Sequence, residues 1–170
     1  MPEADHQWGS DGGDAPPPLW VARGPAGEFI YAGCRSRWIT PGKTTDNFGF
    51  AGWVRDNADE LVKLGPGRHF GEWYGVGIQR GYGLTERRFA LFNTFRWTTE
   101  RPTCCAVVPM LYIGPYNDAA VNEALTNLRH GSHAAKWPGP AEGIVVYMHA
   151  SKTMHKVTLE GDEKPKGSKE

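Results

Sequence analysis

The chain has 170 residues, a length typical of a single domain. Apolar residues make up 39% and charged residues 22%, the values of an ordinary globular protein rather than of a disordered or fibrous chain. Lys and Arg together number 19, as do Asp and Glu, so the net charge is zero. Bulk charge therefore gives no argument for a nucleic-acid partner, and any basic groove has to be local.

Cysteine spacing and hydropathy favour a cytoplasmic protein with no membrane partner. Cys34, Cys104 and Cys105 show no C-x-x-C spacing, and adjacent cysteines are a poor metal fork or disulfide. We expect them to be reduced, buried thiols. No apolar run approaches the length of a membrane span, and residues 1–20 lack the apolar region of a signal peptide. The seven Trp residues are expected mainly in the core, although aromatic rings also stack on bases.

The first third of the chain predicts a loop, a strand and a helix. Residues 1–27 are rich in Gly, Pro and Asp, which predicts a loop or a disordered insertion. A strand is expected over 28–34. Apolar residues at helical spacing predict a helix over 46–64, with Asp46 or Asn47 as its cap and Gly65 and Pro66 as its stop.

The remainder predicts strands interrupted by one more helix. Strands are expected over residues 69–76, 89–97, 105–113, 143–149 and 154–159. A glycine-rich loop separates the first two, and a helix starting at Asn117 or Asp118 and stopping at Gly131 precedes the last two. Residues 161–170 are a charged tail. Strands outnumber helices without strict alternation, which favours an α+β fold with largely antiparallel sheets.

Three charged residues stand out because they occur in strand-like, apolar runs. Glu72 and Glu142 are either outward-facing strand residues or carboxylates that meet a ligand hydroxyl or a metal ion. Lys156 is either solvent-facing or presents its ammonium group to a phosphate. The glycines between residues 75 and 83 match neither G-x-G-x-x-G nor a Walker A loop, so they do not predict a phosphate loop.

Five segments, taken in order, resemble the motifs of ATP-dependent RNA ligases. This family belongs to the covalent nucleotidyltransferases, together with DNA ligases and mRNA capping enzymes. The segments correspond to the arginine segment after motif I and to motifs III, IIIa, IV and V: residues 32–37 (AGCRSR), 68–84 (RHFGEWYGVGIQRGYGL), 89–97 (FALFNTFRW), 141–147 (AEGIVVY) and 154–158 (MHKVT). The resemblance implies an ATP-grasp-like adenylation domain over 28–160, N-terminally incomplete.

The resemblance also implies roles for individual residues around one ATP molecule. Glu72 would hold the ribose hydroxyls, and Phe89 or Phe92 would stack on the adenine ring. Glu142 would support a Mg²⁺ ion near the phosphates, and Lys156 would contact the α-phosphate.

Arg35 and Arg37 would reach a phosphate or the RNA end. The implied partners are ATP and RNA ends, with no stable protein partner. The implied reaction has three steps. A lysine is adenylated by ATP, AMP passes to an RNA 5′-phosphate, and a 3′-hydroxyl displaces AMP and seals the strand.

The sequence departs from the family pattern at its nucleophile. The adenylated lysine of the family lies in a K-x-D-G motif upstream of the arginine segment, and no K-x-D-G occurs in this chain. Lys43 is the first lysine, and its segment Lys43-Thr-Thr-Asp46 lacks the glycine and follows the arginine segment. Either the reading frame starts upstream of Met1, which we favour, or the protein is a non-catalytic nucleotide- or RNA-binding relative. A plain structural domain would leave the order of the five motifs to chance.

The chain as given is therefore expected not to form a lysine–AMP adduct. The test is incubation with α-labelled ATP and magnesium, followed by denaturing electrophoresis. We expect no label on the protein because the nucleophile's motif is absent. Covalent label on this chain would contradict the motif assignment.

Overall fold

The computed structural model describes residues 18–24, 27–33, 37–78, 81–98, 100–131, 136 and 141–159. These residues form an α+β fold with a mostly antiparallel sheet, as the sequence predicted. Neighbouring strands across its six-stranded sheet are β3 (Trp38–Ile39), β2 (Gly27–Gly33), β1 (Pro18–Gly24), β4 (Gly67–Gly75), β5 (Arg87–Leu91) and β6 (Cys105–Val107). The β5–β6 pair is parallel. A separate hairpin consists of β7 (Gly143–Met148) and β8 (Thr153–Thr158).

Strand β1 corrects the expectation that residues 1–27 are all loop. It lies between β2 and β4 and pairs antiparallel with both. Leu19 and Val21 are fully buried, as alternate residues of a strand with one face on a core should be. Pro18 stands at the first position, where a strand tolerates proline. The proline- and glycine-rich stretch before it obscured this short alternation, and residues 1–17 lie outside the described part.

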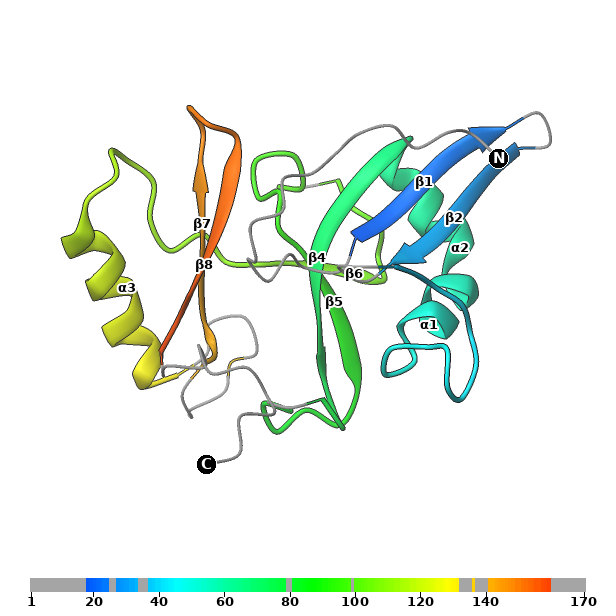
Figure 1. Cartoon of the computed structure of the whole chain (residues 1–170), viewed down its shortest axis with the longest axis horizontal. Coiled ribbons are helices and arrows are strands. Elements are labelled where there is room, and N and C mark those ends of the chain that lie inside the picture. Colours follow the sequence, from blue (N-terminus) through cyan, green and yellow to red (C-terminus); the bar gives the residue numbers. More distant parts are fainter. Residues whose placement is uncertain are drawn as a thin grey trace.

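The main core lies between one face of the sheet and the helical segment that follows β3 (Figure 1). The single helix expected over 46–64 is divided into α1 (Phe50–Asp56), α2 (Ala58–Leu61) and a 3-10 turn (Val62–Leu64). Asp46 precedes α1, yet its carboxylate accepts from the backbone N–H groups of Ala51 and Gly52, at 2.8 and 2.9 Å. The N-cap position itself is Gly49, with no side-chain cap, so neither Asp46 nor Asn47 is the cap residue that the sequence predicted, although Asp46 does bind free N–H groups of the first turn.

Two strands end earlier than the sequence predicted. β5 stops at Leu91, where the chain turns and the Trp97 N–H donates to the Asn93 carbonyl at 3.1 Å. β6 stops at Val107, two residues before Pro109, which has no N–H to donate to a ladder. The segment 108–117 then crosses to α3 (Asp118–Arg129), whose predicted cap Asn117 accepts from the Ala120 N–H at 2.7 Å.

Helix α3 and the β7–β8 hairpin form the end of the molecule opposite to α1 and α2, with β4 and β5 between them (Figure 1). A small second cluster joins α3 to the hairpin through Leu128, Ala141 and Leu159, with Ile144 against it. No helix in the described part of the chain has the length and apolarity needed to cross a membrane.

Truncation of Phe50 tests the importance of the main core. Its ring is fully buried, with centroids 5.3 Å from Trp73 and 5.2 Å from Phe89. We expect Phe50→Ala to lower the free energy of unfolding by about 3–5 kcal/mol, because it removes buried surface and leaves a cavity. Urea unfolding measures the change. The matched control is Phe48→Ala, whose side chain is 52% exposed and should cost less than about 1 kcal/mol. Equal losses in the two variants would contradict this core.

Candidate functional site

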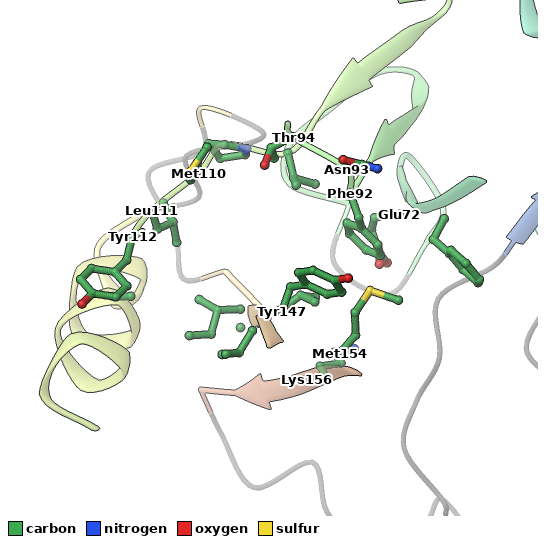
Figure 2. Close-up of a pocket in the computed structure, with 18 of the residues that line it drawn as sticks. Glu72, Phe92, Asn93, Thr94, Met110, Leu111, Tyr112, Tyr147, Met154 and Lys156 are labelled. Atoms are coloured by element: carbon green, nitrogen blue, oxygen red, sulfur yellow. The ribbon is translucent and has the colours of Figure 1, made fainter. Parts of the chain in front are cut away.

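A cavity of about 790 Å³ lies between the main sheet and the β7–β8 hairpin. Figure 2 shows residues of its walls, which are formed by β4, by the end of β5 and the segment after it, by the segment after β6, and by the two strands of the hairpin. Helix α3 contributes Val121, Ala124 and Leu128 to one side. The volume is that of a small-molecule site, in which apolar walls surround a few polar groups.

Strand β4 provides one row of side chains to this cavity. Successive strand residues point to opposite faces, and four alternate residues line the cavity: Arg68, Phe70, Glu72 and Tyr74. The intervening His69 pairs with the core residue Leu19 and is buried; its Nε2 atom lies 2.9 Å from the Gly65 carbonyl oxygen, and it also contributes to the cavity lining. The alternation of β4 thus places Glu72 on the cavity side and not in the core.

The hairpin provides an ion pair on the opposite wall. Glu142 immediately precedes β7, and Lys156 lies on β8 opposite Val145. The Lys156 ammonium donates to Glu142 Oε1 at 2.5 Å, and the two side chains are 30% and 36% exposed. Antiparallel pairing of the two strands therefore brings a cation and a carboxylate together at one point of the cavity wall.

The electrostatics connect Glu72 to this ion pair. Burial, and to a lesser extent the neighbouring Glu142 carboxylate, raise the pKa of Glu72 to about 7, while the Lys156 ammonium opposes the shift. The Glu72 carboxyl group is thus held close to its titration point at neutral pH. This mutual influence requires the three groups to share one region, although they come from distant parts of the sequence.

Of the other predicted site residues that the structure describes, one lines the cavity and two do not. Phe92 lines the cavity, and its N–H donates to the Phe70 carbonyl at 2.9 Å, beside Glu72 (Figure 2). Phe89 is fully buried in the main core, so its ring is not available to a ligand in this cavity. Arg37 is exposed and does not line the cavity, and Arg35 lies outside the described residues.

Tyr147 and Met154 also belong to this site, although the sequence did not single them out. They are register partners on β7 and β8, and Figure 2 shows them between Glu72 and Lys156. Met154 stands two residues before Lys156, the spacing that puts two strand residues on one face. That spacing was the available signal for Met154. Tyr147 could be found only from the hairpin register.

The carboxylates of Glu72 and Glu142 are better suited to a metal ion that is bound together with a ligand than to a metal ion that only protein groups hold. In the described part of the chain, no three His, Cys, Asp or Glu side chains gather as a metal cage. Glu72 and Glu142 line the same cavity. Mg²⁺ keeps several waters and is usually bound through one or two carboxylates together with substrate phosphates. The donor set therefore fits magnesium bound to a polyphosphate.

The chemical groups of the cavity indicate what kind of ligand it can bind. Comparison with protein-family models, with curated proteins and with solved structures finds no match to this chain. The cavity offers carboxylates that accept from hydroxyl groups, an ammonium that attracts an anion, and aromatic and aliphatic walls that cover a flat ring. One ligand that carries all three features is a nucleotide.

The shifted pKa of Glu72 predicts a specific dependence of stability on pH. The folded-state pKa of about 7 lies above the ordinary value of 4.5, so the folded state keeps the proton longer. The resulting stabilisation is complete below pH 4.5 and is lost as the pH rises to 7. We expect the difference in free energy of unfolding, wild type minus Glu72→Gln, to fall by roughly 2 kcal/mol over this interval.

Urea unfolding of both proteins at several pH values measures this difference. Glu123→Gln, which changes an exposed carboxylate on α3, is the control and should show no such trend relative to wild type. A wild-type minus Glu72→Gln difference that stays constant from pH 4.5 to pH 8 would contradict the burial of Glu72 beside Glu142.

Proposed function

We propose that the cavity binds ATP and that the chain is a nucleotidyltransferase domain of the RNA-ligase type. The observation that carries this proposal is the convergence of Glu72, Glu142 and Lys156 on one cavity. The motif resemblance independently implies that these three residues contact one nucleotide. A carboxyl group buried beside a second carboxylate is costly for a purely structural role, which supports a role in binding.

Each end of the proposed ligand has matching protein groups. The Glu72 carboxylate accepts from the ribose hydroxyls. Phe92 and Tyr147, which line the cavity near Glu72 in Figure 2, cover the adenine ring. Lys156 contacts the α-phosphate, and an arriving phosphate competes with Glu142 for its ammonium group.

Displacement of the ion pair would prepare the site for a metal. When Lys156 turns to the phosphate, the Glu142 carboxylate loses its cation and becomes able to hold Mg²⁺ or its waters. Magnesium, when bound, neutralises charge on the phosphates. The residues of this chain contribute orientation and charge: Glu72 fixes the sugar and Lys156 stabilises negative charge on the transferred phosphate.

A second function, non-catalytic binding of a nucleotide or RNA, is favoured by one observation. This sequence contains no K-x-D-G motif, so its residues do not supply the family's nucleophile. A non-catalytic relative would still use Glu72, Glu142 and Lys156 for binding. The two functions can be distinguished at the final sealing step. That step does not require an adenylated lysine, and only the ligase would carry it out.

Calorimetric titration with ATP and magnesium tests the binding site. We expect Glu72→Ala and Lys156→Ala each to weaken ATP binding by about tenfold or more, because each removes a charge-assisted hydrogen bond. Lys43→Ala, which removes an exposed lysine outside the cavity, is the matched control and should bind like wild type. Wild-type affinity in both cavity variants would reject the proposed site.

Sealing of a pre-adenylated RNA separates the ligase from the non-catalytic binder. The 3′-hydroxyl oxygen of an acceptor RNA attacks the 5′-phosphate, the bond to AMP breaks, AMP leaves, and the hydroxyl proton is released. We expect joined RNA without added ATP, and a rate at least about tenfold lower in Lys156→Ala. Lys43→Ala is again the control. ATP binding without any joined product would favour the non-catalytic relative.

A further inference from the structure

Aromatic side chains gather on the face of the sheet opposite to α1. Tyr31 and Trp38 are 50% and 53% exposed, and Phe29 is 43% exposed. Trp20 joins them: its ring centroid lies 6.2 Å from that of Trp38, which is 6.0 Å from that of Tyr31. These four residues are called the aromatic strip below. Isolated exposed rings are common, but rings in contact on one sheet face mark an interaction surface.

Strand register places the aromatic strip on one face and joins it to β4. Trp20 on β1 is directly opposite Tyr31 on β2 and directly opposite Arg68 on β4, so the three side chains form a row across the sheet. The Arg68 guanidinium lies 4.8 Å from the centroid of a Trp20 ring. Residues of the other face, such as Leu19 and Val21, are buried in the core.

The charged residue of this row is a cation, because Arg68 is exposed at its β4 end. Glu28 is the one acidic residue of β1, β2 and β3. It alternates with Phe29 along β2, so it lies on the core face of the sheet and not on the face of the aromatic strip. Rings that can stack on bases, next to a guanidinium group that attracts phosphates, suit single-stranded nucleic acid better than an uncharged apolar protein surface.

The row also reaches the cavity. Arg68 and Phe70 both line it, and Glu72 follows on the same face of β4. We propose that the aromatic strip binds a single-stranded RNA segment and leads its end along β4 to the cavity. The choice of RNA and the delivery of its end to the cavity rest on the proposed ligase-type function. The stacking surface itself is inferred only from the exposure and ring contacts of the aromatic strip.

Fluorescence anisotropy of a short fluorescein-labelled oligouridine tests this surface. We expect Tyr31→Ala and Trp38→Ala each to weaken binding by about tenfold, because each removes a ring on which a base stacks. Trp38→Phe keeps a ring and should restore most of the affinity. Arg68→Ala should lower the slope of log affinity against log salt by about one, the loss of one phosphate contact.

The controls separate this proposal from the proposed function. Phe48→Ala removes an exposed ring outside the aromatic strip and should bind oligouridine like wild type. ATP titration of Tyr31→Ala and Trp38→Ala should match wild type, since neither residue lines the cavity. If ATP fails to bind but oligouridine binding depends on these rings, the stacking surface stands and the proposed function fails.

Three results would overturn the proposal. One is wild-type oligouridine affinity in both ring variants, and another is the absence of oligouridine binding by the wild-type chain. The third is self-association of the wild-type chain that Trp38→Ala abolishes, without any RNA binding, which would assign the aromatic strip to a protein interface.

Discussion

The burial of the Glu72 carboxyl group beside the Glu142–Lys156 ion pair is the interaction on which the account of this molecule depends. A carboxylate removed from water and placed near another carboxylate is unfavourable, and one neighbouring ammonium only partly offsets this, so the pKa of Glu72 rises to about 7. Apolar residues would fill the same space at lower cost. Groups held close to their titration point beside a cavity are more typical of a binding or reaction site than of a structural one.

The architecture explains how these charges come together. Glu72 is fixed by β4, the central strand that pairs with β1 and β5 and is anchored on its other face by the main core. Glu142 and Lys156 belong to a hairpin with only a small apolar cluster of its own. The segment 108–117 and α3 complete the wall between the two (Figure 1). The cavity therefore lies between a well-anchored sheet and a less extensively packed hairpin, an arrangement suited to closing on a ligand.

Local signals in the sequence predicted the α+β class, the cap by Asn117, and the side chains of Glu72, Glu142, Lys156 and Phe92 that meet in the cavity. These features depend on neighbouring residues or on ordered motifs. Strand β1 was missed because a proline-rich stretch precedes its short alternation. The sequence did not show whether Phe89 or Phe92 faces the cavity. The answer depends on where β5 ends, and tertiary packing sets that end. The aromatic strip depends on the register of three strands, which single-strand patterns do not contain.

Carboxyl-carbon NMR of glutamate-labelled protein during titration with magnesium and ATP shows whether Glu72 and Glu142 belong to one ATP site. Variants Glu72→Gln and Glu142→Gln assign the two resonances by removing them one at a time. We expect both resonances to shift together and to saturate at the same ATP concentration, since both carboxylates belong to one site. Saturable ATP binding that leaves both resonances unmoved would contradict this expectation.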